Sequence, residues 1–118
     1  MLRILVVEDD PDIRDVLGEL LVDEGYQVVA AGCGDEGLRR LQDEQFDVVV
    51  SDYSLPGRTG TAMLRAAAQC GRLAGPAILM TAHPKPVVDQ GVRLLRKPLD
   101  LDEFLDEISA ALGPPVWR

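Results

Sequence analysis

Five short, mostly apolar runs recur along the chain, and the first four are separated by segments with helical periodicity. The runs cover residues 2–7, 26–30, 46–51, 77–81 and 92–95. The first lacks polar alternation, which is typical of a strand covered on both faces in a parallel sheet. Alternating strands and helices with short connections leave few possible architectures.

The intervening segments carry helix signals. Asp10 followed by Pro11 is typical of a helix start, and the apolar stripe Ile13, Val16, Leu17, Leu20 and Leu21 stops at Gly25. Asp100 is predicted to cap the closing helix, which should end at Gly113, Pro114 and Pro115. The helices are expected over 11–24, 35–45, 61–69 and 101–112.

This order of elements predicts an α/β fold with a doubly wound five-stranded parallel sheet and helices on both faces. The flavodoxin-like strand order for such a fold is 2-1-3-4-5. Only 16 positions separate Thr81 from Lys97, and Pro84 and Pro86 disfavour a long helix there. The fourth helix of such a fold, which would join the fourth and fifth strands, is therefore expected to be short or missing. Residues 1–118 fit one domain.

The charge balance excludes some classes of function. The chain has 20 acidic and 12 basic residues and a formal net charge of −8, which opposes attraction to nucleic-acid phosphates. Its apolar runs are too short to cross a bilayer, and no signal-peptide pattern opens the chain. We expect a cytoplasmic protein without direct contact to nucleic acid or membrane. Cys33 and Cys70 form no metal-like or redox-like pair.

Acidic, hydroxyl and basic residues follow the predicted strands, at the edge where sheets of this kind bind ligands. Clustered carboxylates repel one another unless a cation lies between them, and oxygen ligands favour hard cations such as Mg²⁺. Asp10 is interpreted as a helix cap. The predicted site consists of Glu8 and Asp9 after the first strand, Asp52 after the third, Thr81 after the fourth and Lys97 after the fifth.

Four segments of the chain resemble the receiver domains of two-component response regulators. They are, in the family's order, RILVVEDDPDIRDVL, FDVVVSDYSLPGRTG, AILMTA and LLRKPLD. Asp52 is followed by Pro56, Gly57 and Gly60 at the family spacing. The resemblance covers nearly the whole chain. It implies a phosphorelay receiver that accepts a phosphoryl group from a phosphohistidine in a Mg²⁺-dependent reaction and signals by protein contact.

The resemblance also implies a role for each residue of the predicted metal site. Asp52 would be the phospho-acceptor, Asp9 would bind Mg²⁺ directly, and Glu8 would act through a metal-bound water. The backbone carbonyl of Ser54 would complete the protein ligands. Such a chain catalyses only its own phosphorylation and dephosphorylation and is not otherwise an enzyme.

Two further residues are implied to hold the phosphoryl group. Thr81 would hydrogen-bond one of its oxygens, and Lys97 would pair with another through its compact ammonium charge. The Lys97–Pro98 peptide bond is implied to be cis. The chain departs from the family at Leu94, where a switch aromatic usually stands. The family's relay from Thr81 to that aromatic is therefore not expected here.

The expected partners are a sensor histidine kinase or a histidine phosphotransfer protein, together with a downstream protein target. The first helix and the loop around Pro98 are expected to form the surface offered to the kinase or phosphotransfer protein. His83, Tyr53 and Trp117 are interpreted as surface, packing and tail residues respectively.

Several alternatives stay open on the sequence. The chain fits a free-standing regulator, but also a receiver excised from a larger hybrid kinase or regulator. A pseudo-receiver that acts without phosphate would have lost at least one site residue, and all are present. A haloacid-dehalogenase-like phosphatase would require a second acid at the position that Ser54 occupies. A flavodoxin-like binder would require a phosphate-binding loop after the first strand, but acidic residues occupy that place.

Overall fold

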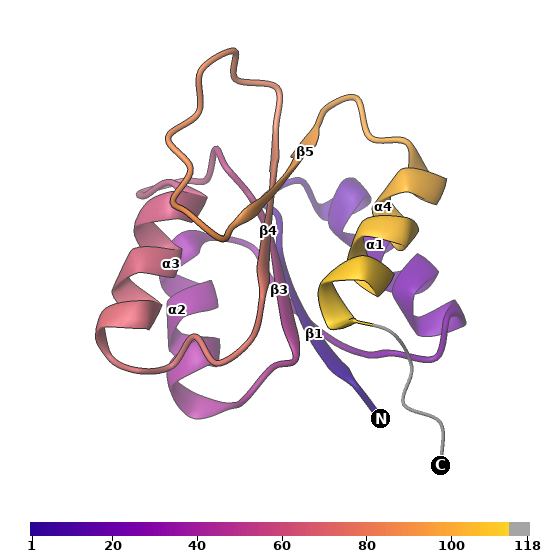
Figure 1. Cartoon of the computed structure of the whole chain (residues 1–118), viewed down its shortest axis with the longest axis horizontal. Coiled ribbons are helices and arrows are strands. Elements are labelled where there is room, and N and C mark those ends of the chain that lie inside the picture. Colours follow the sequence, from indigo (N-terminus) through magenta and orange to yellow (C-terminus); the bar gives the residue numbers. More distant parts are fainter. Residues whose placement is uncertain (114–118) are drawn as a thin grey trace.

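A five-stranded parallel sheet forms the centre of the computed structural model, which describes residues 1–113 (Figure 1). Its strand order is β2-β1-β3-β4-β5, which confirms the predicted order. Pro114, Pro115 and Trp117, to which the sequence assigned a helix end and a tail, lie outside the described residues. The strands are β1 (Arg3–Val7), β2 (Gln27–Ala31), β3 (Val48–Asp52), β4 (Ala77–Thr81) and β5 (Arg93–Arg96).

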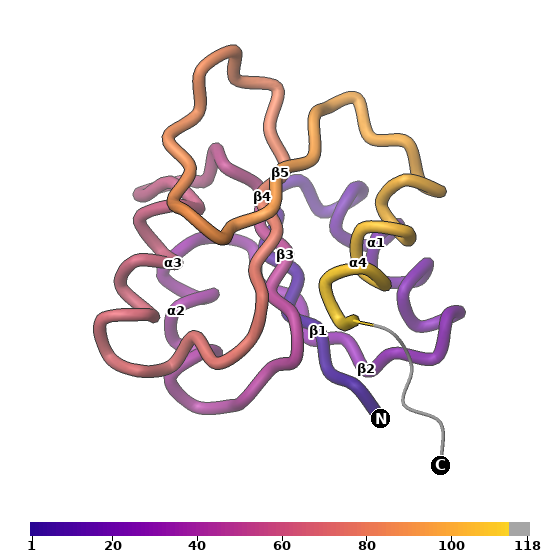
Figure 2. Tube along the Cα trace, viewed as in Figure 1, coloured from indigo at the N-terminus to yellow at the C-terminus, as the bar shows by residue number. Residues whose placement is uncertain are grey.

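Two helices cover each face of the sheet, as Figures 1 and 2 show. On one face, the side chains of α1 and α4 pack against one set of buried strand residues; on the other, those of α2 and α3 pack against the second set. No helix within residues 1–113 is long and apolar enough to cross a membrane. The helices are α1 (Pro11–Asp23), α2 (Gly34–Asp43), α3 (Gly60–Gln69) and α4 (Leu101–Leu112).

The central strands contribute to both hydrophobic layers. In β1, Ile4 and Val6 pack with the α1 and α4 side chains, whereas Leu5 and Val7 pack with those of α2 and α3. All four are fully buried. The absence of polar alternation in this strand is thus explained, because each face of the sheet lies against helices.

Helix starts follow the predicted caps. The Asp10 carboxylate accepts a hydrogen bond from the amide of Asp12 at 2.9 Å, and the Asp100 carboxylate accepts one from Glu103 at 3.0 Å. Asp10 therefore satisfies backbone donors at a helix start, as expected for a cap. The third helix begins one residue before the predicted start, because Thr59 supplies the capping oxygen.

The predicted stripe of α1 is only partly buried. Leu17 and Leu21 are fully buried, but Val16 is 50% exposed and Ile13 is 37% exposed. These exposed side chains line a groove that is described below.

Residues 82–92 join β4 to β5 as a loop without a helix. This finding confirms the expectation that the helix between the fourth and fifth strands is short or missing. The label α4 therefore belongs to the closing helix. The loop is tied to α3: Arg65 forms a two-pronged ion pair with Asp89, and the hydroxyl of Thr61 donates to the carbonyl of Val87. Figure 2 shows this orange segment descending beside α3 before it enters β5.

Candidate functional site

The carboxyl ends of four parallel strands bring the predicted site residues together. Asp52 is the last residue of β3, one position earlier relative to the strand end than predicted, and Thr81 is the last residue of β4, where the run 77–81 also ends. Glu8 follows β1, and its amide donates to the Ala31 carbonyl of β2 at 3.0 Å. Lys97 follows β5, and its amide donates to the Thr81 carbonyl at 2.8 Å. Parallel pairing therefore continues up to the site itself.

Three carboxylates gather at this edge. Glu8, Asp9 and Asp52 each offer an oxygen, and these oxygens lie within 4.8 Å of one another. Glu8 is 1% exposed and Asp52 is 6% exposed, whereas Asp9 is open to solvent. Two acids are thus buried beside a third that solvent can reach.

One oxygen of this cluster lacks a partner. Oε2 of Glu8 is buried and makes no hydrogen bond within the described part of the chain. A buried acceptor without a partner costs free energy, and clustered oxygen ligands suit a hard cation. The residues present therefore fit a Mg²⁺ site.

Lys97 brings a positive charge within ion-pair distance of the cluster. Its Nζ lies 3.2 Å from Oδ2 of Asp52 and 3.6 Å from Oε1 of Glu8. Burial opposes the charge on Lys97, but attraction to Asp52 and Glu8 outweighs it and raises the pKa of Lys97. Burial, with hydrogen bonding to and repulsion from Asp52, raises the pKa of Glu8 to about 7. The single positive charge of Lys97 does not neutralise the negative charge of the three carboxylates.

The raised pKa of Glu8 makes metal-free stability depend on pH. Folded Glu8 keeps its proton up to about pH 7, whereas an ordinary glutamate loses it near pH 4.5. This contribution to stability is therefore full below pH 4.5 and is lost as pH rises through 7.

Urea unfolding at a series of pH values, with chelator present, should show wild type losing stability relative to Glu8→Gln over this range. Glu19→Gln, an exposed change on α1, should follow wild type; parallel wild-type and Glu8→Gln curves would contradict the prediction.

Thr81 presents a buried hydroxyl beside the acidic cluster. Its side chain is 1% exposed, and Oγ1 accepts a hydrogen bond from the amide of His83 at 2.8 Å.

The Lys97–Pro98 peptide bond is cis, as the resemblance implied. Ser54 lies two residues beyond Asp52 with an exposed side chain, and the metal-binding role of its carbonyl stays a prediction.

Backbone contacts hold the site in place. A Cβ at Gly60 would lie 2.5 Å from the Asp52 carbonyl oxygen, so only glycine allows α3 to begin this close to β3. Arg14 Nη1 donates to the Glu8 carbonyl at 2.9 Å. Sequence reasoning missed the contact of Arg14, because no motif joins this α1 residue to the end of β1.

Tyr53 and His83 have contacts that the sequence did not indicate. Tyr53 packs against the hydrophobic layer, as predicted, but its hydroxyl also accepts a hydrogen bond from the amide of Val87 at 3.2 Å. The rings of Tyr53 and His83 lie 5.6 Å apart between centroids. His83 is exposed, in agreement with its predicted surface position.

The fold and this grouping of strand-end residues define a class of protein. The family model described as the response regulator receiver domain matches residues 4–109. The chain therefore belongs to the response regulator receiver domain family, which confirms the resemblance seen in the sequence. This is a receiver domain of two-component signalling.

Particular relatives share both sequence and fold with it. The chain is 40% identical over 116 residues to the transcriptional regulatory protein GlrR of Escherichia coli K12, covering 93% of this chain but only 26% of GlrR. It matches the receiver domain of the hybrid histidine kinase CckA with a TM-score of 0.84 and 31% identity, covering 94% of this chain and 99% of that domain. It matches TrrA of Thermotoga maritima, solved in complex with Mg²⁺-BeF, with a TM-score of 0.81 and 31% identity, covering 92% and 96% of the two chains.

Proposed function

We propose that Asp52 accepts a phosphoryl group from a phosphohistidine in a Mg²⁺-dependent reaction. The observation that carries this proposal is the position of the Asp52 carboxylate, which is buried at the end of β3 and lies 3.2 Å from Nζ of Lys97 and beside two further acids. A nucleophile needs charge neutralisation around it when a phosphoryl group arrives. This cluster offers a carboxylate, a cation and a buried hydroxyl together.

Asp9 and Asp52 are proposed to bind Mg²⁺ directly, with the Ser54 carbonyl, and Glu8 through a bound water. Two features support this assignment: Oε2 of Glu8 has no partner in the part of the chain that the structure describes, and the donor set is all oxygen. When bound, Mg²⁺ would offset negative charge on the phosphoryl oxygens. The complex of the relative TrrA with Mg²⁺-BeF agrees with such a site.

The chain's own residues would then carry out the transfer. An oxygen of Asp52 attacks phosphorus, the phosphorus–nitrogen bond of the phosphohistidine breaks, and the imidazole leaves with the bonding electron pair. Lys97 pairs with one phosphoryl oxygen, and the hydroxyl of Thr81 donates to another. Water later attacks the acyl phosphate to release phosphate and restore Asp52.

Residues 1–118 are proposed to act as one receiver domain that catalyses only its own phosphorylation and dephosphorylation. A pseudo-receiver is not favoured, since the acidic cluster, the hydroxyl and the lysine all lie together. The downstream target is proposed to be a protein. The expected absence of contact with nucleic acid or membrane and the cytoplasmic location stay predictions.

The test is intact-mass analysis after incubation with acetyl phosphate and Mg²⁺. We expect a single phosphoryl adduct that is lost at alkaline pH, as an acyl phosphate should be, and that does not form when the metal is chelated. An adduct that forms equally well with chelator would contradict the Mg²⁺-dependent mechanism. The absence of any adduct would contradict the proposed function.

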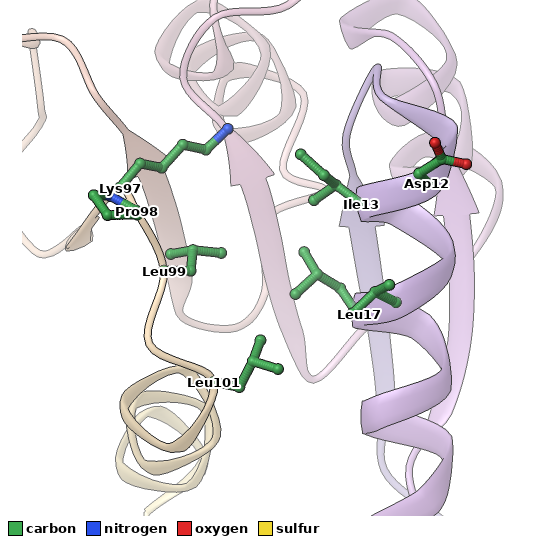
Figure 3. Close-up of a pocket in the computed structure, with 8 residues that line it drawn as sticks. Asp12, Ile13, Leu17, Lys97, Pro98, Leu99 and Leu101 are labelled. Atoms are coloured by element: carbon green, nitrogen blue, oxygen red, sulfur yellow. The ribbon is translucent and has the colours of Figure 1, made fainter.

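A groove beside the site is the proposed docking surface for the kinase or phosphotransfer protein. It has a volume of ≈ 400 Å³ and is lined mainly by apolar side chains of α1 and of the segment after β5. Figure 3 shows Ile13 and Leu17 facing Leu99 and Leu101 across it, with Lys97 at its upper end. A partner helix placed there would bring its phosphohistidine close to Asp52.

The change Val16→Asp tests this surface. Val16 lines the groove and is 50% exposed, so a carboxylate there should repel an apolar partner without disturbing the core. We expect phosphotransfer from a phosphohistidine protein to slow about tenfold or more, the loss typical of an important contact residue at an interface. Phosphorylation by acetyl phosphate should stay unchanged. Val22→Asp, on α1 but outside this groove, is the matched control; equal slowing by both changes would contradict the proposal.

A further inference from the structure

Tyr53 directly follows Asp52 and has a rigidly held backbone. Its amide donates to the Met80 carbonyl of β4 at 2.8 Å, and its carbonyl accepts from the amide of Gly60 at the start of α3, also at 2.8 Å. Movement at the end of β3 or β4 must therefore be shared by Tyr53. Its side chain extends from this fixed position toward the 82–92 loop.

Two polar atoms next to the phosphorylation site hold that loop. The Tyr53 hydroxyl accepts from the Val87 amide at 3.2 Å, and the Thr81 hydroxyl oxygen accepts from the His83 amide at 2.8 Å. The Tyr53 and His83 rings lie 5.6 Å apart and are tilted by 58°. A continuous path of contacts thus joins Thr81, His83, Tyr53 and Val87.

No residue of the 82–92 loop is fully buried, although Arg96 donates to the His83 carbonyl and Val88 and Val92 pack partly buried against the layer of α2 and α3. The ion pair between Arg65 and Asp89 is largely exposed, with 51% and 44% of the two side chains accessible, and such pairs contribute little stability. Val87 is 55% exposed and has its carbonyl bound by the hydroxyl of Thr61. A segment with few buried contacts opens at small free-energy cost. One lost hydrogen bond is therefore enough to change its equilibrium.

Leu94 offers no comparable path. Its side chain is half-buried and packs against the hydrophobic layer of α2 and α3. A leucine has no polar atom that could bond to the loop or to Thr81. The contacts that link the site to the 82–92 loop therefore run through Tyr53 and His83.

We propose that Tyr53 and His83 transmit the phosphorylation of Asp52 to the 82–92 loop, which loses its hydrogen bond to Tyr53. This inference rests on the proposed phosphorylation of Asp52 and adds how the signal leaves the site. The Thr81 hydroxyl, turning to donate its proton to a phosphoryl oxygen, shifts the His83 amide that it holds. His83 then moves against the ring of Tyr53, and the bond from the Val87 amide to the Tyr53 hydroxyl breaks. The 82–92 loop is the surface that changes.

The test is amide hydrogen exchange at Val87, measured by NMR with and without Mg²⁺ and beryllofluoride as the phosphoryl mimic. In wild type, beryllofluoride should speed exchange roughly twofold to twelvefold, the effect of losing one hydrogen bond of about 0.5–1.5 kcal/mol. In Tyr53→Phe, exchange should already be fast without the mimic and change little when it is added. Tyr26→Phe removes a tyrosine hydroxyl from the residue before β2, on the face of the sheet that α1 and α4 cover, and should behave as wild type.

Two outcomes would overturn the inference. One is wild-type exchange at Val87 that stays constant although the amide signals of Asp52 and Gly60 show that beryllofluoride has bound. The other is a full wild-type response in Tyr53→Phe. Failure of acetyl phosphate to give an adduct with wild type would instead overturn the proposed phosphorylation of Asp52. The mass measurement and the exchange measurement therefore separate the two claims.

Discussion

Asp52→Asn should abolish the phosphoryl adduct that acetyl phosphate and Mg²⁺ are expected to give. The amide that replaces the carboxylate has nearly the same shape, but it is neutral and too weak a nucleophile to form an acyl phosphate. It also removes one of the three carboxylates that face the proposed metal. Intact-mass analysis of the variant should show only unmodified protein.

The control for this change is Asp43→Asn, an exposed aspartate at the end of α2. It makes the same chemical replacement away from the site and should give the same adduct as wild type. An adduct of undiminished yield on Asp52→Asn would mean that another residue accepts the group. That result would remove Asp52 from the role proposed for it.

Lys97→Met should slow phosphorylation by acetyl phosphate about 100-fold or more, the usual effect of removing one group that stabilises transition-state charge. Methionine keeps most of the aliphatic chain but removes the ammonium that lies 3.2 Å from Asp52 and 3.6 Å from Glu8. The rate of adduct formation, followed by mass, measures the effect. Asp52 remains as nucleophile, so a slow reaction should persist.

The chain offers a matched control, because Lys85 is its other lysine. Lys85 is exposed in the 82–92 loop, and Lys85→Met should phosphorylate at the wild-type rate. Circular dichroism should show that both variants are folded. Equal rates for Lys97→Met and wild type would contradict the proposed pairing of Lys97 with a phosphoryl oxygen.

The fold was predictable because its signals are local. The apolar runs identified the strands to within one or two residues, and Asp10 and Asp100 marked two helix starts correctly. The short stretch between Thr81 and Lys97, with Pro84 and Pro86, also predicted the missing helix. Caps, prolines and strand periodicity act on their immediate neighbours, so they can be interpreted without knowing what packs against them.

The grouping of the site residues was predictable for a related reason. In a parallel sheet every strand ends at the same edge, so residues that follow different strands must meet there. Glu8, Asp9, Asp52, Thr81 and Lys97 lie together at this edge as a result. The roles carried over from the family stay predictions until phosphorylation and metal binding are measured.

Sequence alone therefore determined the order of elements, the edge of the sheet that carries the site and the residues gathered there. Only the tertiary structure decided that Oε2 of Glu8 is left without a partner within residues 1–113, that Ile13 and Val16 face an open groove, and that Tyr53 bonds to Val87, 34 positions away. The physical reason is that such contacts depend on how side chains from separate elements fit together. Local patterns specify each element, but burial and long-range hydrogen bonds exist only once the elements have packed.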